Sequence, residues 1–359
     1  MEKKVSEEAI VTGYKDVSRL EKLIKDAERI LICGHYSADP DSFGSVISFG
    51  KILRKKYPEK EVILSSEKGI NASTENLPGA EELKSDSVKE LIEISKPDLL
   101  ILLDASEYSR IDGSIDDEIS TYISDNVKKR VIIDHHFNIP DDADIIINNL
   151  RSSCCEEVYY VLVELLGYEI DRDIAENILA GMLSDTGNFT YPNKYLDYSL
   201  QLFKKLVDTG LIVDQVISKF KRMNEKSLLL CGELIKNSTF IGDIMMSHID
   251  EEIFYSIADF ETDPDFAYDS RIFADNFLRL VGESVWGFTI EPRKERGVYK
   301  ISFRSINGTY EVDRIARRLE GGGHKGAAGA TVKAKSIDEV YRIVKEAIRS
   351  EGWSDLIDK

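Results

Sequence analysis

Short, unbroken apolar runs alternate with segments of helical spacing over the first half of the chain. Helical spacing is found over residues 16–28, 43–57 and 87–95. Between these segments lie runs of strand length that are continuously apolar: RILICG from Arg29, EVILSS from Glu61, DLLILLD from Asp98, RVIID from Arg130 and DIIINN from Asp144. Continuous apolar strands between helices are typical of a parallel sheet that is covered on both faces. The pattern therefore predicts an α/β fold built on a parallel sheet.

The second half of the chain has a different order of elements. Helices are expected over 156–166, 174–184 and 196–207. From about residue 225 the pattern predicts a helix, a strand near 240–249, the strands SVWGFTI and VYKISFRS, the helix EVDRIARRLE, a turn GGGHKG, an apolar strand and a last helix from Ile337. The predicted division is an N-terminal extension over 1–17, a first domain over 18–193, a helical linker over 194–222 and a second, smaller α/β domain over 223–359.

Length and composition agree with a globular protein of two domains. The chain has 359 residues, more than one hydrophobic core usually organises, and 42% of them are apolar. Its apolar runs are much shorter than the roughly 18 to 20 residues of a membrane helix, and its opening segment lacks the apolar core of a secretory signal. The four cysteines show no C-x-x-C spacing. We expect a cytoplasmic protein with reduced cysteines and no membrane partner.

The charge balance restricts the classes of molecule that the chain is expected to bind. Aspartate and glutamate number 65 against 47 lysines and arginines, which gives a net charge of −18. This balance disfavours binding of long duplex DNA, which relies on a basic face that neutralises many phosphates. A short nucleotide could still be held by a few local charges. The surplus of carboxylates also favours sites for divalent metal ions.

Acid and imidazole side chains follow three of the predicted strands. His35 follows RILICG, Asp104 ends DLLILLD, and the run Asp134-His135-His136 ends RVII. Ligands of open α/β sheets bind at the carboxyl ends of the strands, so we expect these side chains to share one site. Adjacent residues of an extended strand point to opposite sides. One histidine is therefore expected to bind a metal while the other reaches a substrate, with Asp134 fixing an imidazole.

Two further segments add carboxylates. The loop after the first strand contains Asp39-Pro40-Asp41 and leads into a helix. Asp39 and Asp41 are candidate metal ligands, although this sequence before a helix is also an ordinary N-cap and turn. Asp185 lies in LSDTGNF at the end of a predicted helix, where the helix dipole disfavours a carboxylate unless a cation compensates.

Together these segments supply six candidate ligands, namely His35, Asp39, Asp41, Asp104, His135 and Asp185. A set rich in carboxylate oxygens suits Mn²⁺ or Mg²⁺, and its imidazoles favour Mn²⁺. Six ligands are too many for one ion that must also leave room for a substrate. Two ions that share one carboxylate fit the set and are suited to phosphoryl hydrolysis.

The order of these motifs resembles the DHH phosphoesterase family. The resemblance rests on H-x-x-x-D-x-D-x-x-G-S at 35–45, Asp104, Asp134-His135-His136 and Asp185 in SDTG. A second match, FRS at 303–305 and GGGHKGAAG from 321, resembles the nucleotide-binding domain of nano-RNases, cyclic-dinucleotide phosphodiesterases and RecJ-type nucleases. The chain departs from the family at Ser153-Cys154-Cys155-Glu156, which replaces a Ser-Thr-x-Glu run and puts its hydroxyl contact in question.

The resemblance implies a catalytic domain and a smaller cap domain, with the active site in the cleft between them. It assigns His35, Asp39 and Asp104 to one metal, and Asp41, Asp104, His135 and Asp185 to the other. It also implies that His136 contacts the phosphoryl group. The residues implied to hold the far end of the substrate are Arg304, Ser305, Gly322, Gly323 and His324. Taken alone, the three glycines of GGGH are equally typical of a flexible turn.

The activity that the resemblance implies is hydrolysis, with two Mn²⁺ ions, of RNAs of about two to five nucleotides or of linear dinucleotides to mononucleotides. The nucleotide 3′-phosphoadenosine 5′-phosphate is a further expected substrate. Three alternatives stay open: hydrolysis of cyclic di-AMP, hydrolysis of pyrophosphate or polyphosphate, and a nucleotide-binding regulator without catalysis. A homodimer is also left open.

Overall fold

The structure is a computed structural model that describes residues 14–105, 107–113, 118–136, 143–191, 194–261, 266, 268, 271–306 and 309–353. The chain divides into two compact units, of which the first ends at Arg222 and the second begins at Met223. Most of the predicted extension over 1–17 lies outside the described residues. The cleft between the domains stays a prediction. Across these ranges, no helix is long and apolar enough to cross a membrane.

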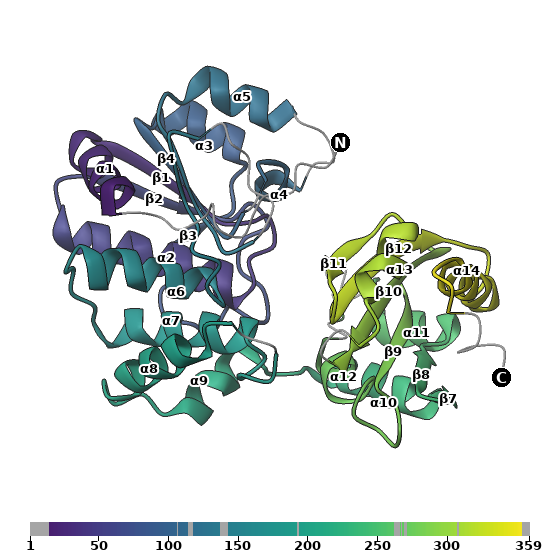
Figure 1. The fold of residues 1–359 in the computed structure, drawn as a ribbon. Helices are drawn as coiled ribbons and strands as arrows, with labels where there is room; N and C mark the ends of the chain where they lie inside the picture. Colours follow the sequence, from purple (N-terminus) through teal and green to yellow (C-terminus); the bar gives the residue numbers. More distant parts are fainter. Residues whose placement is uncertain are drawn as a thin grey trace. The chain divides into compact units, whose positions relative to one another are not determined.

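The first unit is a parallel sheet with helices on both faces (Figure 1). Its strands follow the order β3-β2-β1-β4-β5-β6, with every neighbouring pair parallel. The strands are β1 (Arg29–Cys33), β2 (Glu61–Ser65), β3 (Leu83–Lys84), β4 (Leu99–Leu103), β5 (Arg130–Ile133) and β6 (Ile145–Ile147). The helices are α1 (Tyr14–Asp26), α2 (Pro40–Lys56), α3 (Val88–Ser95), α4 (Ser109–Asp112), α5 (Glu118–Asn126), α6 (Cys154–Tyr159), α7 (Arg172–Asp185), α8 (Leu196–Val207) and α9 (Val213–Phe220).

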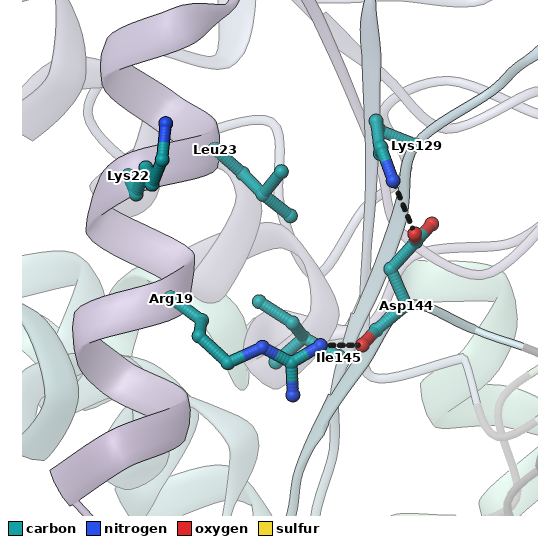
Figure 2. A pocket seen from close by; sticks show the side chains of 6 residues that line it. All are labelled: Arg19, Lys22, Leu23, Lys129, Asp144 and Ile145. Atoms are coloured by element: carbon teal, nitrogen blue, oxygen red, sulfur yellow. Dashed lines mark hydrogen bonds and ion pairs between the residues drawn. The ribbon is translucent and has the colours of Figure 1, made fainter.

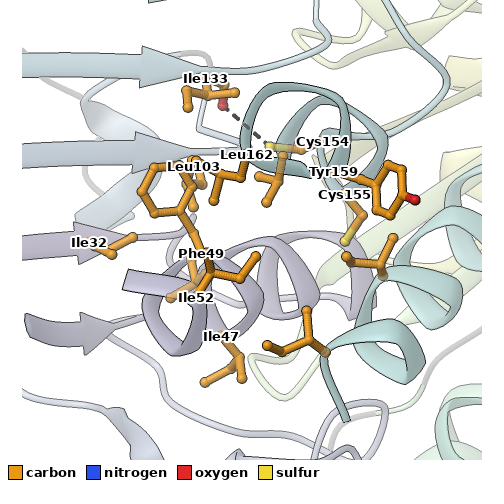
Figure 3. Close-up of a cluster of buried hydrophobic side chains, with 14 of the residues drawn as sticks. Ile32, Ile47, Phe49, Ile52, Leu103, Ile133, Cys154, Cys155, Tyr159 and Leu162 are labelled. Atoms are coloured by element: carbon orange, nitrogen blue, oxygen red, sulfur yellow. Dashed lines mark hydrogen bonds between the residues drawn. The ribbon is translucent and has the colours of Figure 1, made fainter. Parts of the chain in front are cut away.

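The central strands are buried on both faces, as the continuous apolar runs predict. In β4 every residue is buried. Ile101 and Leu103 belong to the core that contains residues of α1, α2, α6 and α7, whereas Leu100 and Leu102 belong to the core that contains residues of α3 and α5. Figure 3 shows part of the larger core, where Phe49 of α2 lies among side chains of the strands and of α6. The prediction of a parallel sheet covered on both faces is confirmed.

Helices α8 and α9 belong to the first unit. The segment 194–222, expected to be a linker, contributes five buried side chains to the larger core: Leu202, Leu206, Leu211, Val216 and Phe220. The helix expected over 156–166 begins earlier, at Cys154, and continues from Tyr160 to Leu165 as a π-helix. The packing of α8 and α9 follows from the apolar side chains on one face of each helix, since burial of that face is the main stabilisation of a short helix.

The second unit is a six-stranded mixed sheet with the strand order β11-β12-β10-β9-β8-β7. The pair β8–β9 is parallel and the other pairs are antiparallel. Its strands are β7 (Thr239–Ile241), β8 (Ile244–His248), β9 (Trp286–Pro292), β10 (Val298–Ser305), β11 (Gly322–His324) and β12 (Ala327–Lys333). Its helices are α10 (Glu225–Lys236), α11 (Glu251–Ala258), α12 (Arg271–Asn276), α13 (Val312–Arg318) and α14 (Ile337–Ser350).

Two elements of this unit differ from the sequence prediction. The single strand expected near 240–249 is a hairpin of β7 and β8, because Gly242 adopts a left-handed φ of 58° that turns the chain. The expected turn GGGHKG contains the short strand β11, which pairs with β12. One face of the sheet packs against α13 and α14, and the other against α10, α11 and α12.

Ile101→Ala should destabilise the first unit and leave the unfolding of the second unit unchanged. Ile101 is fully buried in β4, and such a truncation costs about 2 to 5 kcal/mol. Both tryptophans of the chain, Trp286 and Trp353, lie in the second unit, so their fluorescence reports on that unit. We expect urea unfolding followed by far-ultraviolet circular dichroism to shift, and unfolding followed by tryptophan fluorescence to stay. A shift of both signals would show that the units unfold together.

Candidate functional site

The candidate ligands of the first unit lie where the order of the strands reverses. Strands β1 and β4 are neighbours, while the chain continues from β1 to β2 on one side and from β4 to β5 on the other. His35 follows β1, Asp104 follows β4, and Asp134 follows β5. In open α/β sheets this reversal opens a space at the carboxyl ends of the strands, where ligands bind. The strand connections thus bring together residues that are about a hundred positions apart.

One group of donors lies around His35. Its Nε2 is 3.7 Å from Oδ1 of Asp39 and 3.6 Å from Oδ2 of Asp104. Oδ1 of Asp39 also accepts hydrogen bonds from the backbone of Asp41 and Ser42, so Asp39 is the N-cap of α2. The N-cap expected as an alternative is confirmed, and it coexists with the position beside His35, because a carboxylate has several lone pairs.

A second group of donors lies around His135. Its Nε2 is 3.2 Å from Oδ2 of Asp185, 3.5 Å from Oδ1 of Asp104 and 3.8 Å from Oδ2 of Asp41. Asp185 is the last residue of α7, as predicted. Asp104 therefore faces His35 with one carboxylate oxygen and His135 with the other. Each group, His35–Asp39–Asp104 and Asp41–His135–Asp185, has ligand atoms within 4.8 Å of one another and could hold a metal ion.

The backbone of Asp104 is unusual. Its φ is +54°, in the left-handed region that aspartate and asparagine tolerate better than most residues, and its N–H donates to the carbonyl of Ile133. The side chain is almost completely buried. Such a conformation costs of order 1 to 3 kcal/mol and persists where the surrounding structure holds it. Its location between the two donor groups marks it as the centre of the site.

His136 is oriented by Asp134. Oδ1 of Asp134 lies 2.7 Å from Nδ1 of His136 and accepts from the backbone N–H of both histidines. Burial by itself would raise the pKa of Asp134, but the hydrogen bond and charge of His136 outweigh burial and lower it. The ionised carboxylate keeps a proton on Nδ1, which leaves Nε2 to face other groups.

The expectation that the two histidines point to opposite sides is wrong. Their rings lie 4.4 Å apart. Strand β5 ends at Ile133, and the hydrogen bonds of the next amides to Asp134 end the alternation of an extended strand. Sequence reasoning also missed Asn148, which is buried and donates from Nδ2 to the carbonyl of His136 at 2.6 Å. The one signal for it is the polar pair that ends the apolar run DIIINN.

Two metal-ligating atoms of this site lack the hydrogen-bond partners that buried polar atoms normally have. Among the described residues, neither Oδ1 of Asp104 nor Nε2 of His135 has a hydrogen-bond partner, although both atoms are buried. Burial raises the pKa of Asp41, and the Asp185 and Asp104 carboxylates raise it further. Burial would lower the pKa of His135, but Asp104 and Asp185 outweigh burial and raise it. Crowded carboxylates with unsatisfied oxygens fit a divalent cation, which would neutralise them.

In the second unit, the pairing of strands sets the backbone of the predicted end-binding residues. Arg304 of β10 is opposite Ala327 of β12, which is opposite His324 of β11. The His324 side chain lies outside the described residues. Gly322 is exposed, and Gly323 has a φ of +136°, where a Cβ would lie 2.6 Å from the Ala327 carbonyl, so only glycine fits there.

Ser305 is used inside the second unit. It is completely buried, and its hydroxyl accepts a hydrogen bond from the backbone N–H of Tyr310 at 3.0 Å. Its carbonyl accepts from Nη1 of Arg279 at 3.3 Å. These contacts hold the end of β10, the strand that carries Arg304. The role of Ser305 as a substrate contact stays a prediction.

Comparison with known proteins identifies the family. Residues 29–183 match the DHH family, N-terminal domain, and residues 252–350 match the DHHA1 domain. The chain belongs to the DHH family. It is therefore a phosphoesterase, a hydrolase of a metal-dependent family, and the recognition from sequence motifs is confirmed.

Relatives match over most of the chain. It is 28% identical over 327 residues to "Bifunctional oligoribonuclease and PAP phosphatase NrnA" of Thermus thermophilus, covering 90% of each chain. It is 25% identical to the Bacillus subtilis protein of the same name, covering 93% of it, and 26% identical to the Bacillus subtilis "Cyclic-di-AMP phosphodiesterase GdpP", of which it spans 51%. An "exopolyphosphatase-related protein" from Bacteroides fragilis shares the fold, with a TM-score of 0.80, 24% identity and coverage of 94% and 96%.

At the departure from the DHH family, Cys154 and Cys155 contact Asp41 through their backbone. The backbone N–H groups of Cys154 and Cys155 donate to the two oxygens of Asp41, at 2.6 and 2.9 Å. These backbone contacts do not depend on the side chain, whereas the effect of losing the hydroxyl stays an open question. The thiols themselves donate to carbonyls, that of Cys154 to Ile133 at 3.3 Å (Figure 3).

Two glycines make room for Asp41 in this DHH domain. A Cβ on Gly181 of α7 would lie 2.8 Å from Oδ1 of Asp41 and closer still to the sulfur of Cys155. A Cβ on Gly44 of α2 would lie 2.6 Å from the carbonyl of Asn177. Helices α2, α6 and α7 can therefore approach closely around Asp41 because these positions have no side chain.

The cavity shown in Figure 2 is separate from the metal-ligand cluster. Its volume is about 220 Å³, and its walls are Arg19, Lys22, Leu23, Lys129, Asp144 and Ile145. Lys129 and Asp144 directly precede β5 and β6, so the cavity lies at the amino ends of the strands. Its charges are partly paired, since Lys129 contacts Asp144 at 2.7 Å and Arg19 donates to the Asp144 carbonyl. We assign it no part in the chemistry of the DHH domain.

Gly181→Ala should weaken Mn²⁺ binding without loss of helix. The added methyl group meets Asp41 and Cys155, and displacing the support of a ligand costs about tenfold to a hundredfold in metal affinity. Alanine is itself a better helix former than glycine. The matched control is Gly232→Ala in α10, where a Cβ meets nothing within 4 Å. Calorimetric titration with Mn²⁺ should separate the two variants, and equal affinities would contradict the proposed constraint.

Glu156→Gln should change the pH dependence of stability. Burial raises the pKa of Glu156 from 4.5 to about 7, so the folded chain holds this proton more tightly than the unfolded chain. Stability from this group is therefore lost as the pH rises from about 4.5 to 7, by about 3 kcal/mol in total. Glutamine imitates the protonated acid, so its advantage over wild type should grow across this range. Urea unfolding at several pH values measures it, and parallel pH profiles would contradict it.

Proposed function

We propose that this DHH phosphoesterase hydrolyses RNAs of about two to five nucleotides, or linear dinucleotides such as pApA, to mononucleotides with two Mn²⁺ ions, which Mg²⁺ can replace. It would also convert 3′-phosphoadenosine 5′-phosphate to AMP. The observation that carries the proposal is the position of Asp104, whose two oxygens face two separate donor groups. The names of the two NrnA relatives, which match over most of the chain, agree with these substrates.

The two donor groups define how the ions would be held. His35, Asp39 and Asp104 would bind one ion, and Asp41, Asp104, His135 and Asp185 the other. When bound, two such ions polarise the phosphoryl group and activate a water for attack. The protein holds the ligands in place for this: Asp39 is fixed as the N-cap of α2, and Asp41 by the amides at the start of α6.

His136 would stabilise charge on the phosphoryl oxygens. Its Nδ1 is held by Asp134, so Nε2 is the ring nitrogen that would contact a substrate. Asn148 holds the carbonyl of the same residue, which limits the movement of its backbone. A fixed imidazole next to the metal ligands stabilises developing charge without having to reorganise during the reaction.

The second unit would bind the far end of the substrate. Arg304 is a buried cation, and Gly322 and Gly323 are exposed on the edge strand β11, where the absence of side chains would let an anion approach the backbone closely. His324 would share this role. The match of this unit to the DHHA1 domain supports the assignment. A contact at both ends would favour short substrates.

Hydrolysis of cyclic di-AMP is the second candidate function, favoured by the similarity to the GdpP phosphodiesterase. The deciding experiment compares kcat/KM for pApA, cyclic di-AMP, 3′-phosphoadenosine 5′-phosphate and pyrophosphate in the presence of Mn²⁺. We expect pApA to be the preferred substrate. A clear preference for cyclic di-AMP would replace the main proposal with the second one, and a preference for pyrophosphate would contradict both.

Asp104→Asn should lower kcat by several orders of magnitude and leave the fold intact. Asparagine tolerates the left-handed backbone of this position but carries no charge to share between two ions. The control is Asp259→Asn, because Asp259 has a similar φ of 46° at the end of α11, in the second unit. Activity and metal content would be measured on the same preparation. If Asp104→Asn keeps more than about a tenth of the activity, the shared role of Asp104 is wrong.

A further inference from the structure

Two contacts hold the Arg304 guanidinium in the second unit. The side chain is 11% exposed. Its Nε donates to Oδ1 of Asp275 at 2.6 Å, and its Nη1 donates to the carbonyl of Phe303 at 2.9 Å. No hydrogen bond joins Nη2 to any residue in the described part of the chain. The remaining nitrogen is therefore the one left for a ligand.

Asp275 comes from a separate element that is itself well anchored. It lies in α12, between Ala274 and the segment that contains Leu278. Phe273, Ala274 and Leu278 are completely buried in the core formed with α10 and α11. Because its neighbours are fixed by packing, the Asp275 carboxylate is a fixed acceptor for the Arg304 side chain.

The neighbours of Arg304 in the sheet cannot orient it. Arg304 is opposite Gly287 on β9 and opposite Ala327 on β12. Neither residue has a side chain that could accept a hydrogen bond from a guanidinium. Besides the backbone carbonyl of Phe303, the orientation depends on Asp275. An arginine without such a partner has several rotatable bonds to immobilise when it binds an anion.

We propose that Asp275 is a positioning residue that holds the Arg304 guanidinium with Nη2 directed at the far-end phosphate of a short substrate. This inference rests on the proposed function, in which Arg304 binds that phosphate. The charge of Asp275 opposes phosphate binding, because it partly neutralises the guanidinium and repels an anion. Its contribution is therefore geometric, and charge and geometry predict opposite effects when the carboxylate is removed.

The test compares Asp275→Ala and Asp275→Asn in the full-length, Mn²⁺-loaded enzyme. With pApA, Asp275→Ala should raise KM about tenfold and change kcat by less than about twofold, as for loss of one oriented charge-assisted contact. Asp275→Asn should stay close to wild type, because its amide oxygen still accepts from Nε. Turnover of bis(p-nitrophenyl) phosphate, which has no far-end phosphate, should not change in either variant.

The matched control is Glu295→Ala. Glu295 is exposed in the turn between β9 and β10, whereas Arg304 is near the other end of β10. The control removes one negative charge from the same unit without touching Arg304, so it should leave KM for pApA unchanged. A rise in KM as large as that of Asp275→Ala would show that the rise does not depend on contact with Arg304, and it would overturn the proposal.

A double-substitution cycle separates positioning from other roles. Once Arg304→Ala is present, adding Asp275→Ala should not change KM further, since the group to be positioned is gone. A further rise in KM would overturn the proposal. A lower KM for Asp275→Ala alone would also overturn it, because it would mean that Asp275 only shields the charge of Arg304. Arg304→Lys should bind pApA as weakly as Arg304→Ala, because lysine has no Nε donor in this arrangement.

The Arg304→Lys variant also decides the question if Asp275→Ala does not fold. Full affinity in Arg304→Lys would overturn the need for an oriented guanidinium. Different outcomes would contradict the proposed function and the role of Asp275. If the wild-type enzyme does not hydrolyse pApA, the proposed function fails. If the wild type hydrolyses pApA and Asp275→Ala has the KM of the wild type, the positioning role of Asp275 alone fails.

Discussion

The first unit is organised around the repulsion between carboxylates that its sheet brings to one edge. Asp41 and Asp104 are buried, Asp185 is partly buried, and Asp41 and Asp185 have ligand atoms within 4.8 Å of one another. Two like charges about 4 Å apart repel by roughly 4 kcal/mol in a partly buried environment. His135 and protons on the carboxylates relieve part of that repulsion, and divalent ions would relieve more. The site thus gains its affinity for cations from the crowding that destabilises it when they are absent.

The surrounding fold holds these charges together in spite of their repulsion. Asp41 accepts from two amides at the start of α6, where the helix dipole favours a negative charge, but burial and its neighbours still raise its pKa. Gly44 and Gly181 let three helices close on it. Asp104 has a left-handed backbone at the end of the fully buried strand β4. The packing energy of the two cores compensates for strain and charge at the strand ends.

At its predicted substrate contact, the second unit holds a positive charge instead of negative ones. It buries a cation, Arg304, and gives it one carboxylate partner from α12 and one backbone carbonyl. A buried cation without a partner is destabilising. This cost explains why an acidic residue lies beside a predicted anion-binding group. The first unit thus concentrates negative charge at its metal-ligand cluster. The second unit holds a fixed positive charge at Arg304.

The sequence by itself determined the elements and most of the chemistry. Unbroken runs such as LLILL require a strand buried on both faces, and the polar residues that end these runs fall at one edge of a parallel sheet for that reason. Tertiary structure alone decided which atoms meet. The amides that hold Asp41 come from a helix more than a hundred residues away, and backbone donors leave no signature in a sequence. The side-by-side histidines, the role of Asn148 and the contact between Asp275 and Arg304 likewise depend on where strands end and helices pack, which local pattern does not encode.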